Sequence, residues 1–169
     1  MIRRPRALGF VVVLLGSVDA SCGTVDLSKT LQVADVQSGY YDAGVKNGLN
    51  YLQPQITFRL KNVSSESINS VKLTVAFWRE GTDGEWDSVL HQGIGSSGVA
   101  AGMATEPITA RLGVGYTLEG ARADFFVNSK FRDVTAKIFA TRSGKIFRMG
   151  EYKLEHKIIP TEHRDAPRP

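Results

Sequence analysis

Hydrophobic and polar residues alternate with a period of two along most of this chain, a pattern typical of β-strands with one buried face. The clearest stretches are Pro54–Asn62 and Val71–Phe77. Their apolar positions are Ile56, Phe58 and Leu60 in the first, and Val71, Leu73, Val75 and Phe77 in the second. The polar segment between the two stretches predicts a turn, so we expect the two strands to pair as a hairpin.

Further strands are expected on both sides of this pair. The alternation starts at Leu31 and Val33, and Asn47-Gly48 is a turn signal further along the chain. Later strands are expected at 86–94 and 108–112. The segment 113–130 has no clear period and is expected to form a loop with one short helix over 122–127.

The last hairpin is specified by its turn and its apolar positions. Ser143-Gly144 is the expected turn after a strand that begins at Val134. This turn pairs Ala140 with Phe147 and Ile138 with Met149. Because the apolar positions then shift parity, a β-bulge is expected at Gly150-Glu151.

These short strands, with turn residues every eight to fifteen positions, predict an all-β fold. We expect an antiparallel, immunoglobulin-like β-sandwich of seven or eight strands over residues 30–159. Residues 22–29 are expected to be a linker and residues 160–169 a flexible tail.

The stretch Ile56-Thr57-Phe58-Arg59-Leu60-Lys61-Asn62-Val63-Ser64, followed by Val71–Phe77, resembles the paired strands of small exported bacterial domains of the FxLYD type. The resemblance covers about 40 residues. It differs at the aromatic end, where this chain has Phe77-Trp78-Arg79-Glu80-Gly81 in place of Leu-Tyr-Asp. It implies an immunoglobulin-like fold and an accessory role in the cell envelope, without known chemistry.

The first 22 residues indicate export. Three arginines, at positions 3, 4 and 6, precede an apolar run from Ala7 to Val18, which is too short to span a membrane but suits a signal peptide. Residues 1–21 are therefore expected to be an export signal.

Cys22 is the sole cysteine and follows Ala20-Ser21, so it resembles the lipidated cysteine of bacterial lipoproteins, although Asp19 departs from that pattern. Lipidation of Cys22, cleavage after Ala20 and an uncleaved anchor all remain open.

Charge and composition exclude some partners. Without the export signal, 18 basic and 16 acidic residues remain, a net charge of +2. A nearly neutral domain does not favour nucleic acid as a partner. The expected location is the periplasm or a lipid-anchored position in the envelope.

The sequence favours no catalytic, metal or cofactor site. Gly93-Ile94-Gly95-Ser96-Ser97-Gly98 matches the dinucleotide-binding fingerprint, but neither a helix nor a βαβ unit is expected around it. His91, His156 and His163 do not have the spacing of metal ligands. The serines cluster in turns, where their hydroxyls bond to the backbone, so no catalytic nucleophile is expected. Together these observations predict neither an enzyme nor a bound nucleotide.

Two candidate binding surfaces remain. If Asp83-Gly84 is a two-residue turn, Trp78 pairs with Val89, and together with Arg79 they form an apolar patch suited to a partner protein. The alternative is that the loop before residue 130 covers Trp78.

The second surface is the basic C-terminal hairpin. Its candidate residues for binding a polyanion are Lys137, Arg142, Lys145 and Arg148. Lys137 and Arg148 are expected on the outward side near Phe139, where they could meet lipid headgroups or a surface glycan, or simply protect a sheet edge.

The sequence therefore predicts a non-catalytic, exported envelope accessory protein that binds another, unidentified envelope protein through the Trp78–Val89 surface or a sheet edge. The alternatives are a polyanion or surface-glycan binder that uses the basic hairpin, and a small exported enzyme.

Overall fold

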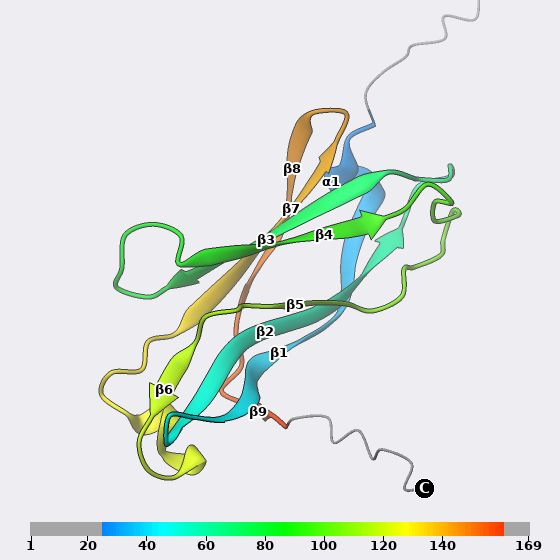
Figure 1. Cartoon of the computed structure of the whole chain (residues 1–169). Coiled ribbons are helices and arrows are strands. Elements are labelled where there is room, and N and C mark those ends of the chain that lie inside the picture. Colours follow the sequence, from blue (N-terminus) through cyan, green and yellow to red (C-terminus); the bar gives the residue numbers. More distant parts are fainter. Residues whose placement is uncertain (1–24, 161–169) are drawn as a thin grey trace, which may run out of the picture.

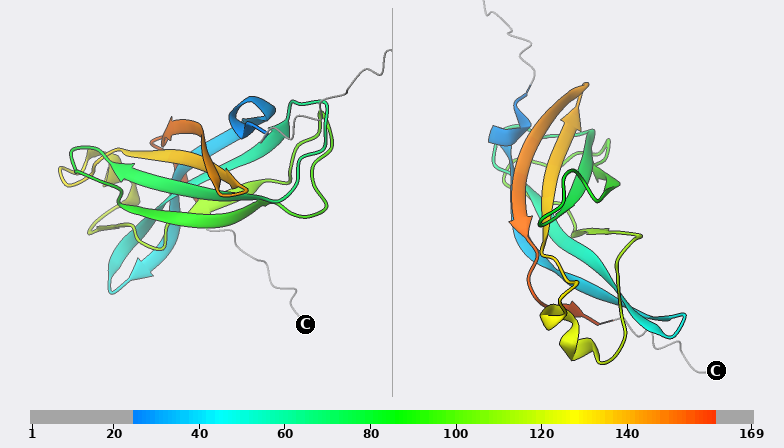
Figure 2. Two further views of the ribbon diagram at one scale, coloured as in Figure 1. Left: turned by 90° about the horizontal axis from the view of Figure 1, so that it is seen from above. Right: turned by 90° about the vertical axis from the view of Figure 1, so that its left-hand side faces the viewer.

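Two β-sheets pack face to face and bury the alternating apolar residues between them (Figures 1 and 2). This computed structural model describes residues 25–160. The five-stranded sheet contains β1 (Leu31–Lys46), β2 (Leu49–Asn62), β5 (Ile108–Arg111), β6 (Tyr116–Leu118) and β9 (Ile158–Ile159). The four-stranded sheet contains β3 (Val71–Arg79), β4 (Asp87–Ile94), β7 (Val134–Arg142) and β8 (Lys145–Lys153). Two short helices complete the fold, α1 (Leu27–Thr30) and the 3-10 helix η1 (Arg122–Val127).

The predicted all-β sandwich is confirmed, with nine strands in residues 25–160 where seven or eight were expected. The additional strands β6 and β9 have three and two residues, too few to show an alternating pattern. All pairings are antiparallel except that between β1 and β9, in which Tyr40 lies beside Ile158.

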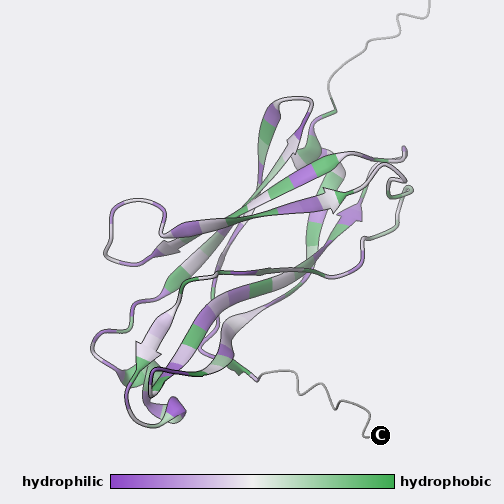
Figure 3. Ribbon diagram, viewed as in Figure 1, coloured by the Kyte–Doolittle hydropathy of each residue, from purple (hydrophilic) through white to green (hydrophobic). Residues whose placement is uncertain are grey.

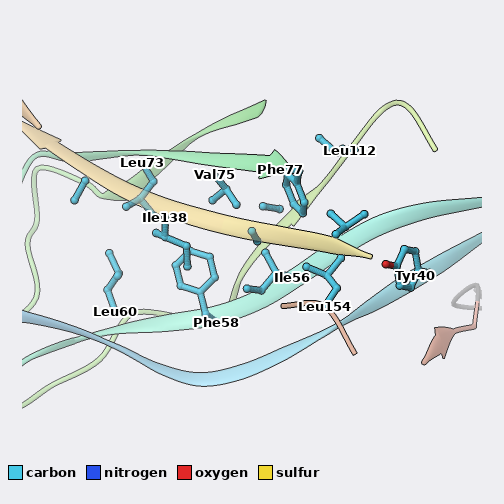
Figure 4. Packing of buried hydrophobic residues seen from close by; sticks show 14 of the residues in the cluster. Tyr40, Ile56, Phe58, Leu60, Leu73, Val75, Phe77, Leu112, Ile138 and Leu154 are labelled. Carbon is cyan, nitrogen blue, oxygen red and sulfur yellow. The ribbon is translucent and has the colours of Figure 1, made fainter. Parts of the chain in front are cut away.

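The core lies between the inward faces of the two sheets (Figure 4). Ile56, Phe58 and Leu60 of β2 face Leu73, Val75 and Phe77 of β3, and all six are at most 1% exposed. The strands alternate between hydrophobic and hydrophilic residues in Figure 3, as expected where one side of each sheet is buried.

The predicted hairpin between 54–62 and 71–77 is wrong. β2 pairs with β1 on one side and with β5 and β6 on the other, whereas β3 pairs with β4 and β7. The chain between Asn62 and Val71 crosses from one sheet to the other. The two apolar faces therefore meet across the core. Two strands show the same alternation of apolar and polar residues whether they pair side by side or face each other from different sheets.

The turns expected at Asn47-Gly48 and Ser143-Gly144 are both present. Asn47 and Gly48 have φ angles of 52° and 78°, and Ser143 and Gly144 have 50° and 77°. Two successive positive φ angles match the twist of the strands that such a turn connects. The expected pair Ala140–Phe147 forms, and the short helix over 122–127 is also found.

The bulge in the last hairpin lies one residue earlier than predicted. Ile138 pairs with Gly150, and Phe139 with Arg148, so Met149 is the extra residue. The predicted pair Ile138–Met149 is therefore wrong. The bulge still restores the parity, because Tyr152 pairs with the core residue Ala136.

The expected linker 22–29 ends earlier than predicted. Leu27 in α1 is completely buried, and the Asp26 side chain accepts a hydrogen bond from Ser28 N at the start of this helix. The domain therefore begins by residue 26. The predicted export signal, the lipidation of Cys22 and all of the predicted tail beyond Pro160 lie outside the described residues.

Candidate binding face

The outward side of the four-stranded sheet, here called the outer face, carries several large side chains. It presents Thr74 and Trp78 from β3, Lys137 and Phe139 from β7, and Leu90 from β4. Leu90 is 78% exposed, whereas Trp78 and Phe139 are half-buried. The solvent side of a sandwich sheet is usually polar, so this apolar content requires an explanation.

Two hollows lie along the outer face in adjacent residue rows. One has a volume of about 420 Å³ and is lined by Lys72, Thr74, Leu90, Gln92 and Thr141, with Leu73 and His91. The other has a volume of about 300 Å³ and is lined by Trp78, Arg79, Glu80, Asp133, Thr135, Lys137, Glu151 and Lys153. The first is lined by Lys72–Thr74 near the start of β3 and the second by Trp78–Glu80 at its end, a span of about 25 Å at the usual rise per residue.

Lys137 covers the indole ring of Trp78 in the second hollow. Its Nζ atom lies 4.0 Å from the ring centroid, within the range of a cation–π contact. Trp78 Nε1 is buried and has no hydrogen-bond partner among residues 25–160.

The predicted pairing of Trp78 with Val89 is wrong. Val89 pairs with Val75 and is half-buried on the core side, whereas Trp78 pairs with Thr135 of β7. The cause is the loop 80–86, which is longer than the expected two-residue turn at Asp83-Gly84 and shifts the register by three residues. An odd shift exchanges the two faces of a strand. Leu90 therefore occupies the outward position that was assigned to Val89.

Arg79 also leaves the predicted patch. Its guanidinium carbon lies 4.6 Å from the ring centroid of Trp86, a residue packed against the core. Because Arg79 alternates with Trp78 along β3, its side chain starts on the opposite side of the sheet.

The four basic residues proposed as a polyanion site do not form one stripe. Lys137 and Arg148 lie outward near Phe139 as predicted, but Lys137 covers Trp78 and Arg148 forms an ion pair with Glu151. Arg142 and Lys145 flank the turn at the far end of the hairpin, where Arg142 Nη2 donates to Asn69 Oδ1 at 3.2 Å.

An aromatic cluster at the β6–η1 end was missed by the sequence analysis. The ring of the buried Tyr40 is surrounded by four others, at centroid distances of 5.2 to 6.2 Å. These are the rings of Tyr116, Phe125, Phe126 and Phe131. The loop before residue 130 therefore packs over Tyr40, not over Trp78.

The Asp133 carboxylate binds two residues of the C-terminal segment, His156 and Lys153, and His156 contacts this cluster. His156 stacks on Phe126 with an interplanar angle of 6°, and its Nε2 lies 2.6 Å from Asp133 Oδ1. Lys153 Nζ lies 2.5 Å from the other carboxylate oxygen. Hydrogen bonds from Lys153 and then from His156 hold the pKa of Asp133 below its ordinary value of 3.8.

The lowered pKa of Asp133 predicts an acid-sensitive contribution to stability. Because the folded state favours the charged carboxylate, the contribution is present above about pH 4 and is lost as the pH falls through the folded-state pKa. We expect Asp133→Asn to be less stable than the wild type at pH 7, with a smaller difference at about pH 3. Urea denaturation at both pH values measures this difference.

Asp83→Asn, in the exposed loop 80–86, is the matched control for the loss of one negative charge. A wild-type advantage over Asp133→Asn that stays constant down to about pH 2 would contradict the role of Asp133.

The arrangement around His156 lacks a nucleophile. Within residues 25–160, its hydrogen bond is to Asp133, and no serine, threonine or cysteine side chain completes a triad. His91 lies opposite Leu73 on the core side, with a buried Nε2, and His163 is outside the described residues. No group of three histidine, cysteine or acidic side chains suited to a metal occurs among residues 25–160.

The glycine-rich segment does not have the context that a dinucleotide requires. Gly93 and Ile94 end β4, Gly98 N donates to Gly95 O in a turn, and Val99 then forms a bridge with Ile68. A strand-like bridge, not a helix N-terminus, follows the glycines.

No helix in the described part of the chain is long and apolar enough to cross a membrane.

Comparisons with known proteins give no assignment. No family model matches the chain, and no curated protein matches it. Among solved structures, the solution structure of AT1g01470 from Arabidopsis thaliana is similar over 86% of this chain and 91% of that chain. The two share 17% sequence identity with a TM-score of 0.43, which is too low to indicate a shared function.

Proposed function

We propose that this chain is a non-catalytic, exported accessory protein of the cell envelope that binds an extended segment of a partner protein along its outer face. The observation that carries the proposal is the pair of adjacent hollows between Lys72 and Glu80, with exposed Leu90 beside one and half-buried Trp78 in the other. Concave, partly apolar surfaces that contain an aromatic residue are typical of protein recognition.

The dimensions and charges of the outer face fit a peptide segment. A length of about 25 Å corresponds to about eight residues in extended conformation. The second hollow is lined by both basic and acidic side chains, namely Lys137 and Lys153 with Glu80, Asp133 and Glu151. Mixed charges of this kind favour a polar polypeptide over a uniformly charged ligand.

The free edge of β4 supports the same interpretation. Within the four-stranded sheet, β4 pairs with β3 alone, so its other edge is not occupied by a strand of that sheet. A segment placed there could add backbone hydrogen bonds while its side chains reach Leu90 and the first hollow.

The location is proposed from the sequence. The basic, apolar and small-residue order of residues 1–21 supports export, and the position of Cys22 supports a lipid anchor, with cleavage after Ala20 as the alternative. The resemblance to FxLYD-type domains agrees with an accessory role in the envelope.

Polyanion binding is the less favoured alternative. It would need the four basic residues of the C-terminal hairpin on one surface. Arg148 is paired with Glu151, Lys137 covers Trp78, and Arg142 and Lys145 lie at the far end of the hairpin.

The outer face can be tested by photo-crosslinking in the native envelope. A photoreactive amino acid at Thr74, the cross-strand neighbour of Leu90, is expected to give a protein adduct of discrete mass. Adding Leu90→Asp should lower the yield by about tenfold, because a charge at an apolar contact costs at least about 1.4 kcal/mol of binding.

Val127→Asp is the matched control, since Val127 is 82% exposed at the opposite end of the domain. Both variants should melt at the wild-type temperature. An adduct that Leu90→Asp leaves unchanged, or that Val127→Asp reduces equally, would exclude the outer face as the binding site.

A further inference from the structure

The outward side of the five-stranded sheet, here called the polar face, differs in composition from the outer face. Ile56 and Phe58 of β2 are completely buried in the core, so the alternating residues Gln55 and Thr57 lie on the outward side. The same alternation places beside them Tyr41 of β1 and both Thr109 and Arg111 of β5. Among residues 25–160, none of the exposed large hydrophobic side chains belongs to β2 or β5. The polar face therefore offers mainly hydroxyl, amide and guanidinium groups.

The Arg111 side chain is held at two points on this face. Its Nε donates to Gln55 Oε1 at 2.6 Å, and its Cζ lies 3.3 Å from the centroid of the Tyr41 ring. Because β2 lies between β1 and β5, Arg111 and Tyr41 meet above Gln55, which is only 7% exposed. A guanidinium that is oriented before a ligand arrives loses less conformational entropy on binding.

The two terminal nitrogens of Arg111 remain available to a ligand. Arg111 is exposed, and within the described part of the chain it forms no ion pair. Of the acidic residues on or near the polar face, Asp35 has its Oδ2 at 3.6 Å from Arg59 Nε. Glu106 precedes β5 by two residues, whereas Arg111 is at the other end of that strand. Two guanidinium nitrogens side by side match the two oxygens of a carboxylate.

A hollow of about 430 Å³ lies on the polar face, one outward position along β2 from Gln55. It is lined by Asp35, Val36, Gln37, Thr57, Phe58, Arg59 and Pro107. The Thr57 Oγ1 atom lies 2.9 Å from Thr109 Oγ1, so this hydroxyl pair stands between the hollow and the row that contains Arg111. Hydroxyl and amide groups both donate and accept hydrogen bonds, which suits the hydroxyl groups of a sugar.

We propose that the polar face binds an acidic sugar. Its carboxylate pairs with the terminal nitrogens of Arg111, and its hydroxyl groups bond to Thr57, Thr109 and Gln37. A sugar is favoured over a peptide because protein partners are usually anchored by apolar or aromatic contacts, and exposed apolar side chains are lacking on β2 and β5. This site uses the proposed envelope location but not the outer face, which belongs to the other sheet.

The site can be tested by isothermal titration calorimetry of the full chain with a galacturonic acid trimer and with a neutral galactose trimer. The acidic trimer is expected to bind at least about tenfold more tightly, because only it can pair with Arg111. Arg111→Lys keeps the charge but removes the paired nitrogens and should weaken binding at least about fivefold. Gln55→Glu keeps Arg111 but adds a carboxylate beside it and should weaken binding by a similar factor.

Arg148→Lys is the matched control, since Arg148 lies on the other sheet in the basic hairpin. It should leave the affinity unchanged, and all three variants should melt at the wild-type temperature. Equal affinity for the two trimers, no loss in Arg111→Lys, an equal loss in Arg148→Lys, or no binding up to about 10 mM would each overturn the acidic-sugar site. A hexaglutamate peptide that binds through Arg111 as tightly as the acidic trimer would also overturn it. The crosslink at Thr74 is measured separately, so any of these results would leave the proposed outer-face function standing.

Discussion

Replacing Phe77 with alanine is expected to lower the free energy of unfolding by about 3–5 kcal/mol. The Phe77 side chain is completely buried in the centre of the sandwich, where it faces the residues of β2 from β3 (Figure 4). Neighbouring strands on both sides hold its backbone, so the surroundings cannot collapse fully into the space left by the ring. Urea denaturation at neutral pH measures the loss.

Phe139→Ala is the matched control, because Phe139 is a half-buried phenylalanine on the outer face of the same sheet. Its loss should cost about 1–2 kcal/mol, in proportion to the smaller apolar area buried. Equal losses for the two variants would contradict the assignment of inward and outward faces.

Replacing Asn62 with alanine is expected to cost about 2–3 kcal/mol, because its amide makes four hydrogen bonds in a completely buried position. Nδ2 donates to Glu66 O at 2.7 Å and to Val99 O at 2.9 Å. Oδ1 accepts from Ser64 N at 3.0 Å and from Ser64 Oγ at 2.7 Å. Unfolding measurements and amide hydrogen exchange in the loops 63–70 and 95–106 test this prediction.

Ser64→Ala provides the comparison, since it removes one hydroxyl and leaves the Asn62 side chain in place. Its cost should be about 1 kcal/mol. If the two substitutions were equally mild, Asn62 would not be the residue that joins these two loops.

The sequence pattern predicts the strands well because alternation and turn residues are local properties. Asn47-Gly48 and Ser143-Gly144 specify their turns through backbone conformations that few other residue pairs adopt. The partners of each strand are not local, and β2 and β3 show why. Alternating apolar residues bury equally well when two strands pair side by side and when they face each other across a core. The polar segment after Asn62 fits either a hairpin turn or a crossing between sheets, so the pattern does not distinguish them.

The candidate site depended on information that the sequence does not carry. The position of Trp78 relative to Leu90 is decided by the length of the loop 80–86, and a turn motif at Asp83-Gly84 suggested a shorter one. Asp133 and His156 are 23 positions apart, and no spacing rule connects them. The three phenylalanines at 125, 126 and 131 were the available indication of an aromatic cluster, but they do not identify Tyr40 as its centre.

The parallel pairing of β1 with β9 affects when this domain can finish folding. Tyr40 N donates to Lys157 O, and Ser38 accepts a hydrogen bond from Glu155, 117 positions later in the chain. The first strand therefore leaves the ribosome long before the segment that flanks it exists. Contacts so distant in sequence form late and slowly, so the five-stranded sheet stays incomplete until residues 155–159 have been synthesised and have docked beside β1.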